Sequence, residues 1–211
     1  MRYALAYPKG GVGKTNLAVH LARHLLNQGP TLLIDGDPEE VAATWAAWRR
    51  ETYPDLVTPT TVRLRGRAIL DEGREVAHGF AHTVIDTGGR DGPGLRNALL
   101  LSQRVIAPLG YDGFDTVNLM HFLEQVKTAQ DFNPELKLAF VLTRVHKNSN
   151  FTQLLEDFKE LKLTLFRTRV RDLMAFKYAN KAGLTVTEYT PRNAAAVHDM
   201  RRFCDEVENW Q

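Results

Sequence analysis

The sequence has one cysteine, Cys204, and lacks long apolar runs, internal repeats and low-complexity segments. A single cysteine excludes a disulfide framework and any CxxC metal or redox site, and with them the iron–sulfur reductases and carriers. No apolar run approaches the roughly 20 residues that a membrane-spanning helix needs. Cys204 lies among apolar residues at helical spacing, which indicates a small residue of the core.

The sequence also lacks a large excess of either charge, because it has 27 Lys and Arg and 25 Asp and Glu, for a net charge of +2. Any affinity for nucleic acid must therefore come from a local basic patch. A length of 211 residues predicts a single domain over residues 1–211. The chain passes into an apolar strand within its first residues, so no signal peptide is expected and the protein is predicted to be cytoplasmic.

The most informative stretch is residues 7–16, which read Tyr-Pro-Lys-Gly-Gly-Val-Gly-Lys-Thr-Asn. An apolar, strand-like run precedes it, and apolar residues at helical spacing follow it. A glycine-rich turn between a strand and a helix is the context of a phosphate-binding loop, in which backbone N–H groups face the anion. In such a loop Lys14 binds the β- and γ-phosphates, and the Thr15 hydroxyl ligates Mg²⁺. The alternative is a plain turn with a surface lysine.

Two later apolar strands end in carboxylates. Residues 31–34 lead into Asp35 and Asp37, and residues 80–85 lead into Asp86. Parallel strands bind ligands at their C-terminal ends, so these side chains are predicted beside the phosphate loop. Asp86 has the Walker-B arrangement, in which a carboxylate holds Mg²⁺ through water, and the glycines after it allow a switch loop to move with the γ-phosphate. For Asp37 alone, a polar loop that caps the next helix is the alternative.

Strand-like and helix-like segments alternate along the chain. This pattern predicts an α/β fold with a mostly parallel twisted sheet of about seven or eight strands and helices on both faces, and the phosphate-loop motif makes it the P-loop NTPase type. The tryptophans Trp45 and Trp48 lie three apart on one predicted helix, either in the core or as a patch for a partner. The apolar stripe predicted for the helix at 112–129 is Phe114, Val117, Met120 or Leu119, Leu123 and Val126. The other predicted helices are 39–51, 67–77, 91–102, 148–160 and 194–210, and the other predicted strands are 61–64, 104–109, 136–142 and 164–166.

The loop departs from the standard pattern, because Pro8 stands at the first glycine position and a second lysine, Lys9, precedes the glycines. The run Lys-Gly-Gly-Val-Gly-Lys-Thr resembles the deviant Walker-A ATPases, the ParA and MinD family, and the length resembles the compact, ParF-like ParA type. The resemblance implies that Lys9 reaches across an ATP-bound homodimer to the partner's nucleotide. Asn16 replaces the usual Thr or Ser at the α-phosphate, where its amide can donate a similar bond.

The same resemblance assigns roles to residues outside the loop. It implies that Asp37 orients or activates the attacking water, that Asp35 supports the water shell of the metal, and that Thr143 contacts adenine. Lys9, Lys14 and Asp37 are then the catalytic residues, and Thr15, Asp35 and Asp86 hold Mg²⁺, the two carboxylates through water. The predicted residues that bind ATP or ADP are Lys9, Gly10, Gly11, Val12, Gly13, Lys14, Thr15, Asn16 and Thr143.

The C-terminal part is locally basic, with eight Lys or Arg and three acids from Leu165 to Arg202. Arginines at alternate positions of an extended segment point to one side, which suits phosphate contacts on a duplex without base reading. ParA-type relatives bind non-specific DNA through this part of the chain. The alternative is a solvated basic face with local salt bridges. The predicted DNA-binding residues are Arg167, Arg169, Arg171, Lys177, Lys181, Arg201 and Arg202.

The resemblance implies a nucleoid-associated partition ATPase that segregates plasmid or chromosome DNA. An ATP-bound homodimer would bind DNA, and a ParB- or ParG-like adaptor would stimulate hydrolysis. A lysine clamp with no arginine finger in place predicts slow basal turnover. The last helix mixes both charges on its outer face, so no membrane contact is expected. The alternatives are a positioning ATPase for another cargo, such as a carboxysome or a chemosensory array, and a carboxylate-activating biosynthetic enzyme of the same fold.

Overall fold

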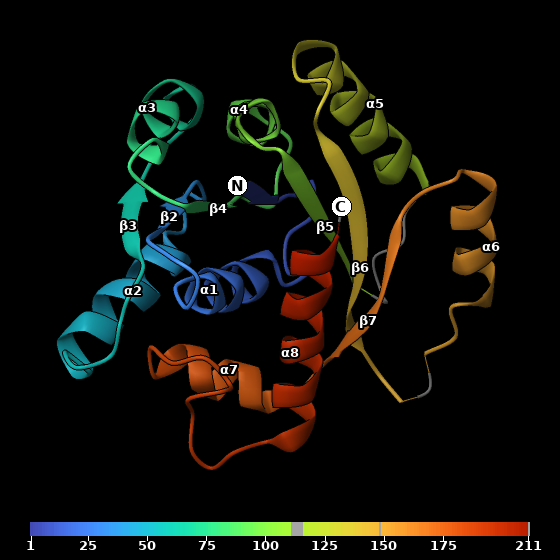
Figure 1. Ribbon diagram of the computed structural model, residues 1–211. Coiled ribbons are helices and arrows are strands. Elements are labelled where there is room, and N and C mark those ends of the chain that lie inside the picture. Colours follow the sequence, from blue (N-terminus) through green and yellow to red (C-terminus); the bar gives the residue numbers. More distant parts are fainter. Residues whose placement is uncertain (111–115, 148, 211) are drawn as a thin grey trace.

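The computed structural model describes residues 1–110, 116–147 and 149–210 (Figure 1). At its centre lies a seven-stranded sheet with the strand order β3-β2-β4-β1-β5-β6-β7. Every paired neighbour is parallel, which confirms the predicted P-loop NTPase fold. The strands are β1 (Arg2–Leu5), β2 (Thr31–Asp35), β3 (Thr60–Arg63), β4 (His82–Asp86), β5 (Arg104–Gly110), β6 (Lys137–Val145) and β7 (Leu165–Arg171).

Helices cover both faces of the sheet. One face carries α1, α2, α7 and α8, and the other carries α3, α4, α5 and α6 (Figure 1). Alternate strand residues supply the two cores: Leu5 and Leu33 pack on the first face, and Ala4 and Ile34 on the second. The helices are α1 (Lys14–Leu25), α2 (Val41–Thr52), α3 (Ala68–Ala77), α4 (Pro93–Leu101), α5 (Thr116–Phe132), α6 (Thr152–Glu160), α7 (Met174–Lys181) and α8 (Ala194–Asn209).

The predicted buried face of α5 was wrong in part. Val117 is 77% exposed and Met120 is 45% exposed, whereas Leu119 and Phe122 are fully buried. The helix packs through Leu119, Phe122 and Val126, a stripe with spacings of three and four residues. Of the predicted stripe, Val126 and the alternative Leu119 are confirmed, and Leu123 is partly buried against the same core. Phe114 and the other residues at the predicted start of this helix lie outside the described ranges.

Trp45 and Trp48 do not share one environment. Trp45 is buried and its indole N–H donates to the Leu184 carbonyl at 3.3 Å, while Trp48 is 52% exposed. Three residues along an α-helix leave two side chains about 60° apart, enough to turn one of them out of the core. The core interpretation therefore holds for Trp45 alone. Cys204 is buried as predicted.

The last strand is longer than the sequence pattern indicated. β7 continues to Arg171, and its outward residues are Arg167, Arg169 and Arg171, which confirms that these side chains share one side. β7 is an edge strand, and α8 packs along it. Within the described part of the chain, no helix has the length and apolar character needed to cross a bilayer.

Candidate functional site

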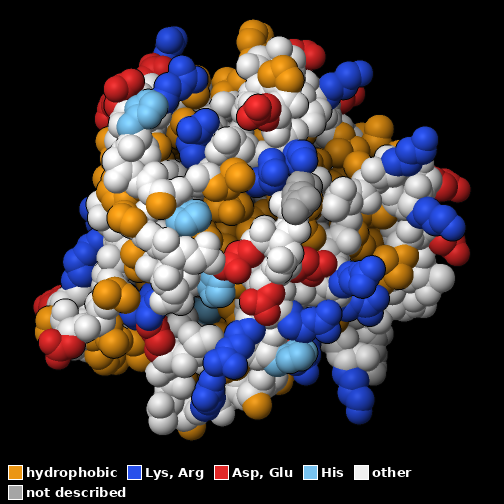
Figure 2. Space-filling model, viewed as in Figure 1, with side chains coloured by type: hydrophobic (Ala, Val, Ile, Leu, Met, Phe, Trp, Pro, Cys, Tyr) orange, Lys and Arg blue, Asp and Glu red, His pale blue; other side chains and the backbone are white. Residues whose placement is uncertain are grey.

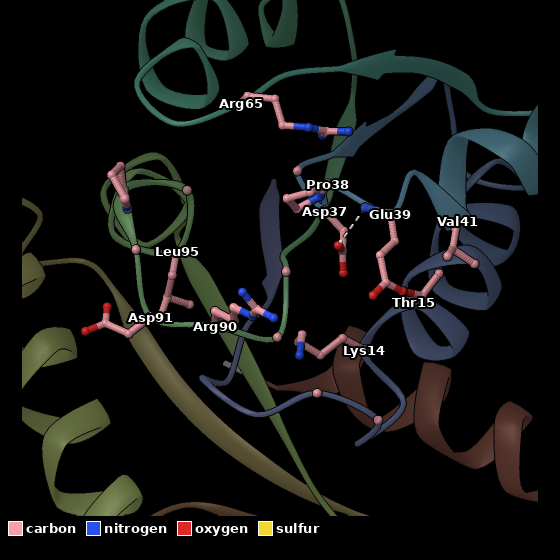
Figure 3. Close-up of a pocket in the computed structure, with 18 of the residues that line it drawn as sticks. Lys14, Thr15, Asp37, Pro38, Glu39, Val41, Arg65, Arg90, Asp91 and Leu95 are labelled. Carbon is pink, nitrogen blue, oxygen red and sulfur yellow. Dashed lines mark hydrogen bonds between the residues drawn. The ribbon is translucent and has the colours of Figure 1, made fainter.

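A cleft of about 1010 Å³ opens at the C-terminal ends of the central strands (Figure 3). The strand register pairs Leu5 with Asp86 and Asp35 with Asp86, so β1, β2 and β4 end side by side. Four segments line the cleft: the glycine-rich loop after β1 and the loops after β2, β3 and β4. The motifs predicted from separate parts of the sequence therefore meet in one place, where α/β sheets bind ligands.

The glycine-rich loop has the backbone shape of an anion cradle. Gly11 and Gly13 have φ angles of 73° and 95°, in the left-handed region that favours glycine. Helix α1 begins directly afterwards, and its first residues, Lys14 and Thr15, line the cleft. The Lys14 ammonium donates to the Lys9 carbonyl at 2.7 Å and so spans the loop. Burial lowers the pKa of Lys14, although Asp86 and Asp37 raise it. Backbone N–H groups and one ammonium thus converge on a site for a phosphate.

Other residues of the predicted nucleotide set support the loop. Asn16 lines the cleft, and its side-chain oxygen accepts a hydrogen bond from the Asn180 amide of α7 at 3.0 Å. Within the described ranges its own amide hydrogens have no acceptor, so they can donate to a ligand. Thr143 is buried beneath the loop and its hydroxyl donates to the Val12 carbonyl at 2.7 Å. Its contact with adenine stays a prediction, and so does the role of Lys9, which lies beside the cleft lining.

Asp86 is the carboxylate best placed for a metal. It is fully buried at the end of β4, and neither oxygen has a well-formed hydrogen-bond partner in the described part of the chain. Burial raises its pKa to about 8, although the Thr15 hydroxyl and the Lys14 ammonium lower it. A buried carboxylate whose oxygens lack well-formed hydrogen bonds is costly unless a cation joins it. Carboxylate and hydroxyl oxygens are ligands that Mg²⁺ prefers, so Thr15 and Asp86 fit this ion.

The two aspartates after β2 have different surroundings. Asp35 is fully buried, and its oxygens accept hydrogen bonds from the backbone N–H of Asp37 at 3.0 Å and of Ala43 at 2.7 Å. Asp35 therefore fixes the loop and the start of α2. Asp37 lines the cleft, and its Oδ1 accepts from the Glu39 N–H at 3.0 Å (Figure 3). The roles of Asp35 at the metal and of Asp37 at the water stay predictions.

Two arginines of the cleft were missed from the sequence. Arg65 donates to the Asp35 carbonyl at 2.7 Å and to Glu40 Oε1 at 3.0 Å, so it braces the loop after β2. Arg90 belongs to the loop after β4, and Figure 3 shows its side chain on the side of the cleft where Lys14 lies. The sequence carries one signal for Arg90, its position four residues after Asp86.

Residues 3–186 match the family described as the CobQ/CobB/MinD/ParA nucleotide binding domain. The chain belongs to this family. Members of this family are nucleotide-hydrolysing ATPases, which confirms the predicted enzyme class. The chain is 28% identical to the maintenance of carboxysome distribution protein A of Gloeobacter kilaueensis, over 96% of this chain and 92% of that protein. It is 27% identical to the chromosome-partitioning ATPase Soj of Thermus thermophilus, over 98% and 94%.

The structure is also similar to that of a biosynthetic enzyme. The cobyrinic acid a,c-diamide synthase of Mycobacterium smegmatis, solved with a bound ATP analog and magnesium, superposes with a TM-score of 0.76. That match covers 98% of this chain and 93% of the synthase at 18% sequence identity. The likeness establishes the shared architecture, and the choice between a positioning ATPase and a synthase depends on other features.

The predicted DNA-binding residues lie on β7, α7 and α8 and are exposed. Figure 2 shows Lys and Arg side chains over the lower part of this face, with acidic groups between them. Arg171 forms an ion pair with Asp199 of α8 at 2.6 Å, and the Arg169 guanidinium lies 5.2 Å from the Phe151 ring centroid. Arg171 therefore matches the alternative of a local salt bridge, and DNA contact by this surface stays a prediction.

Proposed function

We propose that this protein is a DNA-carried positioning ATPase that binds ATP with Mg²⁺ in the cleft. The observation that carries the nucleotide site is the buried Asp86 carboxylate, which lies beside Thr15 and Lys14 without a well-formed hydrogen-bond partner in the described ranges. The ATP analog and magnesium in the similar synthase structure support the same ligands here. Thr15 and Asp86 would hold the Mg²⁺, which would supply positive charge to offset the charge of the phosphates.

The residues of the cleft divide the work of hydrolysis. Lys14 and the loop N–H groups would bind the phosphates, Thr15 and Asp86 would hold the metal, and Asp37 would orient the attacking water. Asp35 would keep Asp37 in place through the hydrogen bond to its backbone N–H. Lys9 would act on the nucleotide of the second subunit in an ATP-bound homodimer.

The exposed cations of the C-terminal part would bind duplex DNA through its phosphates, without base reading. Six exposed members of this set have no ion pair in the described part of the chain: Arg167 and Arg169 on β7, Lys177 and Lys181 on α7, and Arg201 and Arg202 on α8. DNA held by such contacts would place the protein at the nucleoid. A ParB- or ParG-like adaptor would stimulate hydrolysis and release it.

The cargo we propose is plasmid or chromosome DNA, moved by a compact, ParF-like ParA protein. The relative named as a chromosome-partitioning ATPase supports this cargo. Carboxysome positioning is the second candidate, because two relatives named for carboxysome distribution match the chain at 28% and 23% identity. A DNA-carried ATPase would serve either cargo, so the first experiment addresses the shared step.

To test this proposal, binding to a random-sequence DNA duplex is measured with ATP, with ADP and without nucleotide, each at two salt concentrations. We expect binding in the ATP state alone, with an affinity that falls steeply as salt rises. Replacing Lys177 and Lys181 by Ala should weaken binding and lower the salt slope by about two, one for each lost phosphate contact. If ATP binds while DNA is ignored in every nucleotide state, the carboxylate-activating enzyme becomes the better description.

A further inference from the structure

The loop after β4 is held at both ends. At its start, the Thr87 hydroxyl donates to the Leu5 carbonyl of β1 at 2.9 Å. At its far end, the Asp91 carboxylate contacts α5, with His121 Nε2 at 3.0 Å and the Gln125 amide at 2.7 Å. The residues between these anchors therefore have a defined place at the edge of the cleft.

The middle of this loop lies against the phosphate loop. A Cβ atom on Gly89 would stand 2.6 Å from the Gly10 Cα and 2.8 Å from the Gly10 nitrogen, both backbone atoms. Such contacts are too close for any side chain, so the two backbones touch because position 89 is glycine. The next residue, Arg90, consequently starts from a point directly beside the loop that would hold the phosphates.

Arg90 differs from the other arginine of the cleft in what its guanidinium contacts. Arg65 is engaged by the Asp35 carbonyl and the Glu40 carboxylate. In the described ranges, the exposed Arg90 guanidinium has no hydrogen bond or ion pair, and it extends into the cleft on the side of Lys14 (Figure 3). A guanidinium carries five N–H donors in a planar fork that matches phosphate oxygens. The Arg90 guanidinium is thus available for a ligand bound in the cleft.

We propose that Arg90 is a catalytic arginine, which contacts the terminal phosphate of ATP bound in the cleft of its own subunit. A water oxygen forms a bond to the γ-phosphorus as the bond from that phosphorus to the bridging oxygen of ADP breaks. ADP, inorganic phosphate and one proton result, and the proton passes to solvent. Arg90 donates hydrogen bonds to the γ-phosphate oxygens as negative charge shifts during this step. The expectation that the chain lacks an arginine finger is thereby revised.

This inference rests on ATP hydrolysis in the cleft and does not depend on DNA or cargo. The test compares the full-length protein with Arg90→Ala and Arg90→Lys, and with Arg74→Ala as a charge-matched control on the exposed side of α3. Phosphate release measures kcat. A fluorescent nucleotide competed with ADP, or with ADP plus aluminium fluoride and Mg²⁺, measures affinity for the product and for a transition-state mimic.

We expect Arg90→Ala to lower kcat by about 100-fold or more. Its affinity for ADP with aluminium fluoride should fall in parallel, its affinity for ADP should stay within about twofold of the wild type, and Arg90→Lys should recover part of both losses. Arg74→Ala should match the wild type. An unchanged kcat in Arg90→Ala, or equal losses for ADP and for the mimic, would overturn the proposal. If the wild type ignores DNA while Arg90→Ala loses hydrolysis, the DNA-carried function fails and this inference stands.

Discussion

Arg49 and Glu188 form a two-pronged ion pair beneath the surface, with Nη2 to Oε1 at 2.7 Å and Nη1 to Oε2 at 2.9 Å. Arg49 is fully buried on α2, and Glu188 lies in the segment between α7 and α8. The arginine also donates to the carbonyls of Val57 and Gly183, and Glu188 accepts from the Thr185 N–H. This cluster joins α2 to the segment between α7 and α8, the two helices that carry predicted DNA-binding residues.

Arg49→Ala should destabilise the protein by about 3–5 kcal/mol, because it leaves Glu188 without its main partner and two carbonyls without a donor. Urea unfolding measures this loss of unfolding free energy. Arg74→Ala, an exposed arginine on α3, is the control and should change the free energy by less than about 0.5 kcal/mol. Equal midpoints for both variants would contradict the structural role of the buried pair.

Acid should destabilise the fold in two steps. Burial lowers the pKa of His20 to about 4, so the stability linked to neutral His20 is complete above pH 6.5 and is lost as the pH falls toward 4. Burial alone would raise the pKa of Glu188, but hydrogen bonds from Arg49 and Thr185 outweigh it and lower the pKa to about 2. The stability linked to ionised Glu188 is therefore lost as the pH falls from about 4.5 toward 2.

The free energy of unfolding, measured by urea titration at each pH, should fall by up to about 3 kcal/mol between pH 6.5 and pH 4 through His20. His20→Gln supplies a donor for the Asn16 carbonyl and an acceptor for the Val186 N–H without a titrating ring. This variant should show a flatter profile over that range. An identical slope in the variant would assign the acid sensitivity to other groups.

The features that the sequence predicted are formed by residues close together in the chain. The features that it missed are formed by residues far apart in the chain. The strand ends at Asp35 and Asp86 and the loop before Lys14 are local patterns, and the parallel topology places local patterns of this kind together. Arg65, Arg90 and the pair Arg49–Glu188 acquire their surroundings from segments distant in the sequence. No periodicity reports such contacts. On α5, the predicted stripe kept a strict spacing of three residues, whereas the buried face of the helix has spacings of three and four, so the prediction holds near Val126 and fails at Met120 and Val117.

Lys14→Ala should reduce the affinity for ADP by at least about 100-fold. The variant would remove the ammonium that spans the loop and that we assign to the phosphates. Fluorescent-nucleotide titration measures this affinity. Lys9→Ala is the matched variant: it should keep ADP affinity and lose the ATP-dependent dimer, seen by light scattering. ADP affinity of wild-type strength in Lys14→Ala would count against the site, and an intact ATP-dependent dimer in Lys9→Ala would count against the action of Lys9 in trans.

Asp37→Ala should bind ATP and fail to hydrolyse it, because the cleft would lose the carboxylate that we assign to the attacking water. If the protein is carried on DNA, the variant should remain on a duplex after ATP addition, whereas the wild type dissociates as ATP is consumed. Phosphate release and filter retention of labelled duplex measure the two effects. Normal phosphate release would refute the role of Asp37, whatever the duplex assay shows.

Gly89→Ala tests the contact between the loop after β4 and the phosphate loop. Its Cβ would overlap the Gly10 backbone, so one loop must shift, at a cost of about 1–3 kcal/mol that urea unfolding measures. The displaced loop would also carry Arg90 away from the phosphates, and hydrolysis should slow. Gly92→Ala is the control for stability, because a Cβ there meets no atom within 4 Å and should cost less than about 0.5 kcal/mol. If Gly89→Ala is as stable and as active as the wild type, the two loops do not depend on this close approach.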